Sequence, residues 1–223
     1  MSDLHRPQHV PSVLIWGGWY GSRNIGDSAI LLGLKELIRE VNAGADVYVR
    51  ALSTDVDYTS THGVTGERAL VKSEAIRPWA WLRVILSFWR PDRVVVSGGT
   101  PIFDSSHAIR TLYMLLPRVL RVPMVVFGAG VKPLVSWYGR RSIPLLLRGA
   151  DYVSVRDADS LAILNGLGVP DVELSADSAF FATPAPASDV HKLLASYGID
   201  SEDSLMVVAP RLLSKERKRL YLE

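Results

Sequence analysis

The first residues with chemical potential lie in Gly18–Asp27, between an expected first strand and an expected first helix. A dinucleotide-binding protein would carry G-x-G-x-x-G here, so that its backbone can approach a pyrophosphate. This stretch instead has Trp19 and Tyr20 after its first glycine and ends in the sequence Asn24-Ile25-Gly26-Asp27. Two aromatic rings, an amide and a carboxylate favour a polar ligand other than a dinucleotide.

Glycines also cluster at Gly17-Gly18, Gly98-Gly99 and Gly128–Gly130, each directly after a short apolar run. In open parallel sheets, ligands bind beyond the carboxyl ends of the strands. Three clusters at one such edge would form a single site. The alternative is that these glycines serve only tight turns between strands and helices.

Several other chemistries find no support in the sequence. The absence of cysteine excludes disulfides, zinc–thiolate sites and cysteine nucleophiles. The five histidines have neither metal-ligand nor catalytic-triad spacing. His107 is the one nearest to a motif, three residues after Asp104, and we expect it to be solvated. The sequence therefore predicts no metal site and no cofactor.

Alternating strands and helices are expected to position these groups. Apolar runs predict strands at 13–15, 46–52, 93–97, 123–127 and 152–155. Helical spacing predicts a helix that follows Asp27 and continues to Val41, helices at 76–89, 109–120 and 137–147, and one that starts near 157. We expect Asp27 to cap the first of these helices. The alternation predicts an α/β fold, a Rossmann-like parallel sheet with helices on both faces.

Composition and segment order suggest how the chain is divided. The 223 residues are 48% hydrophobic with a net charge of only +2, which favours a globular protein and argues against nucleic-acid binding. We expect an N-terminal extension at 1–12, a Rossmann-like domain at 13–182, a linker at 183–188 and an incomplete second domain at 189–223. That second domain would comprise a helix at 189–197 and a strand at 205–208. No signal peptide or span of about 18 apolar residues is evident, so a soluble, cytoplasmic protein is expected.

At this point the sequence resembles the polysaccharide pyruvyl transferase family. Gly18–Asp27 matches the family's Gly-x-[aromatic]-Gly-x-x-Asn-x-Gly-Asp segment at every named position. Three later segments are similar in the same order: "SGGTPIFD" (97–104), "GAGVKP" (128–133), and "VRDADSLAILNGLGV" (155–169) with "ADSAF" (176–180). Ser28, Thr100 and Lys132 depart from the family's pattern, so the resemblance defines the fold more closely than the acceptor.

The resemblance implies a two-domain, GT-B-like enzyme with its substrate cleft between the domains. It would move pyruvate from phosphoenolpyruvate, a co-substrate, onto a sugar as a ketal. The acceptor would belong to a cell-surface exopolysaccharide or to a lipid-linked precursor of the cell envelope. The family's catalytic histidine would lie in a missing part of the second domain, so we expect these 223 residues alone to be inactive. A GT-B glycosyltransferase using a nucleotide sugar and a non-catalytic binding module are the alternatives.

The same resemblance suggests roles for individual residues. Asp27 either caps the helix or binds and deprotonates an acceptor hydroxyl as a catalytic base. Trp19 and Tyr20 either stack on a sugar or join the core. The expected substrate-binding residues are Tyr20, Asn24, Gly26, Gly98, Gly99, Thr100, Gly128, Gly130 and Arg211.

Two arginines have contrasting expected roles. Arg211 follows the apolar strand of the second domain, where its guanidinium would meet a carboxylate or phosphate in the cleft. Arg156 and Asp157 follow another strand of the first domain, and we expect this pair to be structural.

The helix expected at 76–89 mixes tryptophans with arginines. In one interpretation it buries Trp81, Ile85 and Phe88 against the sheet. In the other it lies on an anionic membrane surface, which would suit a lipid-linked acceptor. Both interpretations stay open from the sequence.

Overall fold

The computed structural model describes residues 10–70, 74, 77–89, 91–104, 107–200 and 204–206. The chain divides into two compact units, Met1–Thr183 and Pro184–Glu223. Among the described residues, no helix combines the length and apolar character needed to cross a bilayer.

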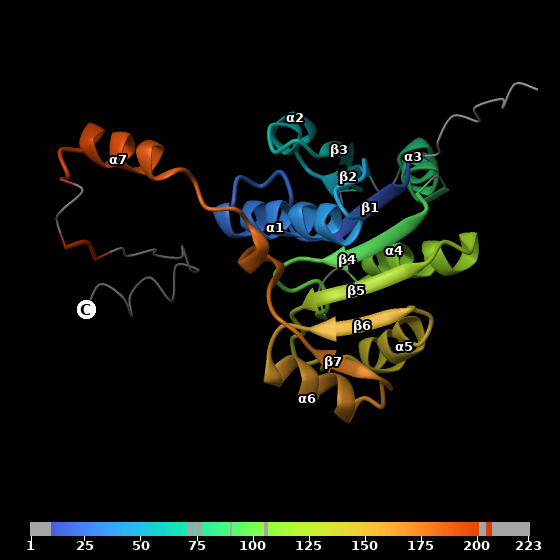
Figure 1. The fold of residues 1–223 in the computed structure, drawn as a ribbon. Coiled ribbons are helices and arrows are strands. Elements are labelled where there is room, and N and C mark those ends of the chain that lie inside the picture. Colours follow the sequence, from blue (N-terminus) through green and yellow to red (C-terminus); the bar gives the residue numbers. More distant parts are fainter. Residues whose placement is uncertain are drawn as a thin grey trace, which may run out of the picture. The chain divides into compact units, whose positions relative to one another are not determined.

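The first unit is built on one seven-stranded parallel sheet with the order β3-β2-β1-β4-β5-β6-β7 (Figure 1). The strands are β1 (Ser12–Gly17), β2 (Tyr48–Ser53), β3 (Thr65–Arg68), β4 (Arg93–Ser97), β5 (Met124–Ala129), β6 (Tyr152–Val155) and β7 (Val172–Leu174). The predicted α/β class with a Rossmann-like parallel sheet is confirmed.

Helices connect successive strands of this sheet. They are α1 (Ile25–Val41), α2 (Val56–Ser60), α3 (Pro78–Trp89), α4 (His107–Leu120), α5 (Trp137–Leu147) and α6 (Ala158–Gly166), followed by the short 3-10 helix η2 (Ser178–Phe181). The helices predicted at 76–89, 109–120 and 137–147 are confirmed to within two residues at each end.

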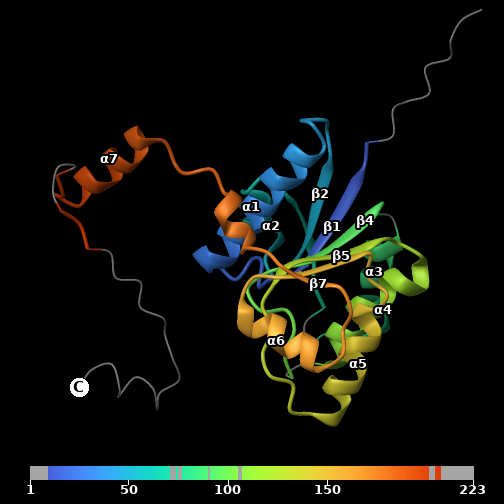
Figure 2. The same cartoon turned by 60° about the horizontal axis from the view of Figure 1, so that its bottom comes forward.

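The helices cover the sheet as two layers of unequal size (Figure 2). Helix α1 packs on one face, where Ile30, Leu31 and Leu34 meet alternate side chains of β1 and β2. Helices α3, α4, α5 and α6 cover the other face and bury the larger core, which includes Phe88, Met114 and Leu147. Helices therefore lie on both faces, as predicted.

The second unit contains helix α7 (Ala187–Ser196), which begins two residues before the predicted helix. Leu205 and Met206, in the described part of the predicted strand, have no regular secondary structure. Val207, Val208 and Arg211 lie outside the described residues. The predicted domain boundaries remain a prediction.

Candidate functional site at the carboxyl edge of the sheet

The carboxyl ends of β1, β4, β5 and β6 lie next to one another in the sheet. The chain runs from β1 outward to β3, and then from β4 outward to β7 in the opposite direction. This reversal between β1 and β4 is a topological switch point, the usual place for a ligand in an open α/β sheet. The structure therefore places the three glycine clusters side by side at the edge where a ligand site is expected.

Helix α1 begins earlier than its sequence suggested, and this corrects the role given to Asp27. Asn24 is the N-cap, and its side-chain oxygen accepts the Gly26 N–H at 2.9 Å. Asp27 lies inside the first turn, where its Oδ1 accepts the Trp19 N–H at 3.1 Å. The prediction that Asp27 caps the helix is wrong, because Asn24 has the extended backbone and the acceptor that a cap requires.

The glycines of the first loop allow close contacts with the loops on either side. A Cβ at Gly98, where φ is +143°, would lie 2.3 Å from the Gly18 nitrogen. A Cβ at Gly21 would lie 2.3 Å from the Asp55 nitrogen, and the Tyr20 carbonyl accepts the Thr54 N–H at 3.0 Å. Backbone packing against the ends of β4 and β2 therefore holds this loop.

Tyr20 belongs to the core of the α1 face. It is only 2% exposed, and its hydroxyl donates to the Ser97 carbonyl at 2.7 Å. Burial raises the pKa of Tyr20 far above its usual range, and the charges of Asp27 and Asp177 raise it further. Of the two roles expected for Tyr20, this burial favours the core over stacking on a sugar. Trp19, its neighbour, is 66% exposed.

The remaining glycines of the edge divide into packed and open positions. Gly98, Gly128 and Gly130 are buried. A Cβ at Gly128 would lie 2.5 Å from the Ala176 carbonyl oxygen, and one at Gly130 would lie 2.3 Å from the Gly99 carbonyl oxygen. These contacts favour the alternative that the three buried glycines serve tight turns and close packing rather than ligand binding. Gly99 and Thr100 are half-buried, and Asn24 and Gly26 are exposed.

The segment around η2 joins the carboxyl edge to helix α1. The Ser178 hydroxyl donates to the Ile30 carbonyl at 3.3 Å and lies 3.4 Å from the Ser97 hydroxyl. A Cβ at Gly33 would lie 1.9 Å from the Ser178 carbonyl oxygen, so only glycine fits at this point of α1. Sequence reasoning missed Gly33, although a glycine inside a helical pattern often marks close packing.

Arg156 is held between two carboxylates at the end of β6. Its Nη1 lies 2.7 Å from Asp177 Oδ2, and its Nε lies 3.4 Å from Asp157 Oδ2. Asp157 also caps α6 by accepting the Ser160 N–H at 2.8 Å, and Asp177 caps η2 by accepting the Ala179 N–H at 3.0 Å. These contacts support the structural role expected for Arg156 and Asp157. They also bind η2 to the end of β6.

The surroundings of Asp157 shift the pKa of its carboxyl group. Partial burial acts against its charged form. The hydrogen bonds from Ser160 and the nearby Arg156 guanidinium outweigh that effect and hold the pKa of Asp157 below its usual value. Asp157 is therefore ionised wherever the pH is near neutral.

A further family segment, "SGGTPIFD", holds the loop that leads into α5. Asp104 Oδ1 accepts the Ser136 hydroxyl at 2.7 Å, and Asp104 Oδ2 accepts the Ser136 N–H at 2.9 Å.

Within the described residues, no three histidine, aspartate or glutamate side chains are grouped to hold a metal ion.

Comparison with known proteins gives a family match over most of the chain. A family model described as polysaccharide pyruvyl transferase matches residues 24–222. No curated protein matches the sequence. Among solved structures, the Moco carrier protein from Chlamydomonas reinhardtii is similar over 84% of this chain and 99% of that chain, with 12% identity and a TM-score of 0.32.

Proposed function

Because the chain belongs to the polysaccharide pyruvyl transferase family, we propose that it transfers pyruvate from phosphoenolpyruvate to a sugar. The family implies a transferase with a saccharide acceptor. The acceptor that we propose is a cell-surface polysaccharide or its lipid-linked precursor, modified in the cytoplasm. The observation that carries this proposal is the family match over residues 24–222.

The proposed reaction needs a base, an acid and an anion site. One sugar hydroxyl adds to C2 of phosphoenolpyruvate while a proton reaches the methylene carbon, which becomes a methyl group. A second hydroxyl then attacks C2, and the C2–O bond to phosphate breaks. The products are a cyclic pyruvate ketal and inorganic phosphate. A positioned carboxylate can take the hydroxyl proton.

We propose that the sugar acceptor binds at the carboxyl edge of the first unit. Asp27 is half-buried, and one of its carboxylate oxygens accepts the Trp19 N–H. In the described part of the chain, its other oxygen has no hydrogen bond, so it can take a hydroxyl proton. Trp19 offers an exposed ring to a sugar face, and Asn24 and Thr100 offer polar groups.

Phosphoenolpyruvate carries a phosphate and a carboxylate, so its binding site needs positive charge. Arg156, at the carboxyl edge, does not provide that charge. The guanidinium of Arg156 is shared by Asp157 and Asp177, so one cation faces two carboxylates. A phosphate and a carboxylate would be repelled there. We therefore propose that phosphoenolpyruvate is bound mainly by a second domain, with Arg211 as one ligand, in a GT-B-like arrangement.

The GT-B-like arrangement also implies a further acceptor contact, a set of domain boundaries and a contact with the membrane. Gly99 would offer its backbone N–H group to the acceptor, whereas the N–H of Gly26 is donated to the Asn24 side chain. Residues 13–182 would form the acceptor domain, 183–188 the linker, and the donor domain would begin at 189. Peripheral contact with a membrane would bring the enzyme to a lipid-linked acceptor.

The test is a donor comparison with the complete gene product. Incubation with a saccharide acceptor and phosphoenolpyruvate should release inorganic phosphate and add a ketal methyl group, which proton NMR detects. Parallel reactions with nucleotide sugars should leave the acceptor unchanged. Glycosyl transfer without ketal formation would contradict the proposal in favour of a glycosyltransferase. Activity with neither donor class would favour a binding module.

A further inference from the structure

The sequence between residues 75 and 150 is strongly basic. It contains eleven arginine and lysine residues but only two acidic ones, Asp92 and Asp104, whereas the whole chain has 25 basic and 23 acidic residues. Helices α3, α4 and α5 contain no aspartate or glutamate. The outer surface of these three helices is called here the α3–α5 layer. The segment that contains the layer has a net positive charge, which the rest of the chain largely balances.

Helix α3 is apolar on both of its sides. Its inner side buries Ala80, Val84 and Phe88, and Trp81 and Ile85 pack partly against the same core, which confirms the burial predicted for this helix. Its outer side exposes large apolar side chains at spacings of three and four residues. They are Trp79 (52% exposed), Leu82 (57%), Leu86 (52%) and Trp89 (66%). A helix that is apolar all round is normally covered on every side.

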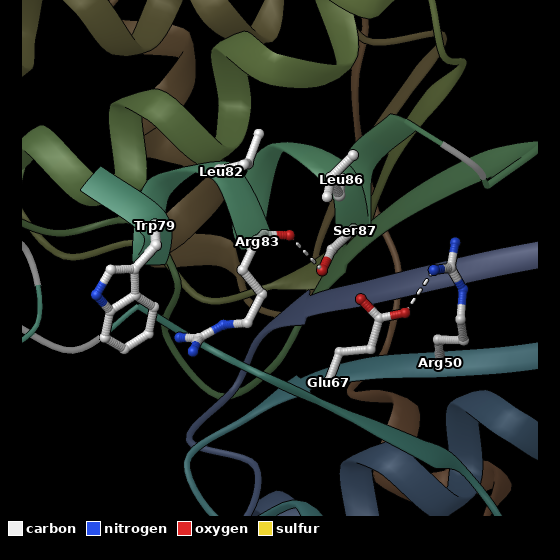
Figure 3. A pocket seen from close by; sticks show the side chains of 7 residues that line it. All are labelled: Arg50, Glu67, Trp79, Leu82, Arg83, Leu86 and Ser87. Atoms are coloured by element: carbon white, nitrogen blue, oxygen red, sulfur yellow. Dashed lines mark hydrogen bonds and ion pairs between the residues drawn. The ribbon is translucent and has the colours of Figure 1, made fainter. Parts of the chain in front are cut away.

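A pocket of about 480 Å³ lies under this outer side of α3 (Figure 3). Trp79, Leu82 and Leu86 line it together with the ion pair of Arg50 and Glu67. Arg50 is 6% exposed, and its Nε and Nη2 have no hydrogen-bond partner among the described residues. The pocket therefore combines apolar walls with a largely buried arginine–glutamate ion pair.

The arginines around this pocket outnumber the glutamates. Glu74 is shared by Arg83 and Arg68, at 3.1 and 2.7 Å. Arg77 lies over the Trp79 ring, with its guanidinium carbon 5.5 Å from the ring centre. Since one glutamate faces two of these arginines and Arg77 adds a further cation, the surroundings of the pocket are positively charged.

The same combination recurs on α5. A second pocket, of about 380 Å³, is lined by Val135, Trp137, Arg140 and Arg141. Val135 and Trp137 are 84% and 77% exposed. Apolar side chains flanked by arginines thus occur at both ends of the α3–α5 layer.

We propose that the α3–α5 layer docks on the surface of an anionic lipid bilayer. The inference rests on the proposed function, to which it adds the surface and the lipid charge that recruit the enzyme to a lipid-linked acceptor. Exposed tryptophan and leucine side chains insert at the level of the headgroups, and the arginines bind lipid phosphates. A second copy of the same face would place like charges against each other, which disfavours a symmetric dimer here.

The first experiment measures binding of the full chain to vesicles by co-sedimentation. Vesicles of phosphatidylcholine with one quarter phosphatidylglycerol should bind the protein, and vesicles of phosphatidylcholine alone should bind it at least tenfold more weakly. Raising the salt concentration should weaken binding to the anionic vesicles, because surface attraction is screened. Equal binding to both vesicles, or binding to neither, would overturn the inference.

Two pairs of matched variants locate the surface. The double variant Arg140→Glu with Arg141→Glu should lower the partition coefficient at least about 30-fold, since each basic residue near an anionic surface contributes about 1 kcal/mol and the new carboxylates are repelled. Arg39→Glu with Lys192→Glu makes the same change in net charge on α1 and α7 and should bind nearly as the wild type does. Leu82→Ser with Leu86→Ser should lower binding roughly tenfold. Leu174→Ser with Leu193→Ser changes leucines of similar exposure on β7 and α7 and should not.

The outcomes separate this inference from its alternatives. Equal losses in the test and control variants would overturn the docking surface. A wild-type dimer that Leu82→Ser with Leu86→Ser converts to a monomer, without vesicle binding, would assign the surface to a second copy. Ketal formation without vesicle binding would refute this inference alone, and vesicle binding without ketal formation would refute only the proposed function.

Discussion

The carboxyl edge of the sheet and the α3–α5 layer place different demands on their sequences. At the edge, an added Cβ at Gly98 or Gly130 would approach a neighbouring backbone atom to 2.3 Å. On the layer, Leu82 and Trp89 are more than half exposed, so other side chains fit there without a clash. The edge therefore requires particular residues at fixed spacing, whereas the layer requires only an average composition.

This difference explains why the two regions are recognised in different ways. The edge is found by motifs, because backbone contact distances permit only glycine at some positions. The layer is found by counting charges and apolar side chains, and no individual position of α3 identifies it. A motif is consequently ambiguous evidence for a ligand, since Gly98, Gly128 and Gly130 are explained by packing alone.

The largest effect is expected from Gly33→Ala. Alanine normally stabilises a helix by about 1 kcal/mol relative to glycine. In α1 its Cβ would lie 1.9 Å from the Ser178 carbonyl oxygen, so η2 must move away. We expect the free energy of unfolding to fall by about 3 kcal/mol, measured by urea denaturation.

Gly166→Ala in helix α6 is the matched control for this variant. No atom lies within 4 Å of a Cβ at Gly166, so alanine should raise the free energy of unfolding by about 0.5 kcal/mol. A Gly33→Ala protein as stable as the wild type would show that η2 is not fixed on α1, and the edge would then be no more constrained than the layer.

The fold could be predicted from the sequence largely because its central strands are apolar on both faces. Arg93–Ser97 and Tyr152–Val155 were predicted with their observed bounds, since β-branched runs in buried parallel strands are unambiguous. The edge strands β3 and β7 were missed. They are four and three residues long and largely exposed, so no apolar run marks them.

The sequence predicted that three glycine clusters meet at one edge of the sheet, but not which contacts they make there. Each cluster follows an apolar run, and topology rules were sufficient to bring the ends of those strands together. The sequence left Tyr20 open between core and sugar contact and made Asp27 the cap, because it does not show that the Tyr20 ring turns inward to Ser97 or that Asn24 starts the helix. Those outcomes depend on contacts between residues far apart in the chain.

The second prediction concerns Asp27→Asn and asks whether the edge does chemistry. The cap is Asn24, and an asparagine at 27 keeps an oxygen for the Trp19 N–H, so the fold should be almost unaffected. If Asp27 is the base, ketal formation by the complete gene product should fall at least about 100-fold. The rate of phosphate release with acceptor present is the measurement.

Asp159→Asn provides the control for charge at a helix start. Asp159 lies in the first turn of α6 as Asp27 does in α1, so both variants lose a similar, small dipole interaction. Asp159→Asn should leave the rate of phosphate release unchanged. An unchanged rate in Asp27→Asn as well would reduce Asp27 to a structural contact with Trp19.

Tyr20→Phe should have a smaller effect, and on stability alone. The variant keeps the buried ring but removes the hydroxyl that donates to the Ser97 carbonyl at 2.7 Å. The free energy of unfolding should fall by about 1 kcal/mol, the usual contribution of one buried hydrogen bond. Ketal formation should persist near the wild-type rate, and a loss as large as that of Asp27→Asn would return Tyr20 to the substrate site.

The smallest effect is expected from Asp157→Asn, and it depends on pH. The pKa of Asp157 is lowered in the folded protein, so its carboxylate stabilises the fold at pH values above its unfolded pKa, and this contribution is lost as the pH falls through the folded pKa. Asparagine caps a helix about as well as aspartate, so the variant loses chiefly the charge interaction with Arg156. Urea denaturation at pH 7, 5, 3 and 2 should show a small difference between wild type and variant at neutral pH that disappears under acid. A difference that stayed constant with pH would mean that Asp157 acts only as a cap and that Arg156 depends on Asp177 alone.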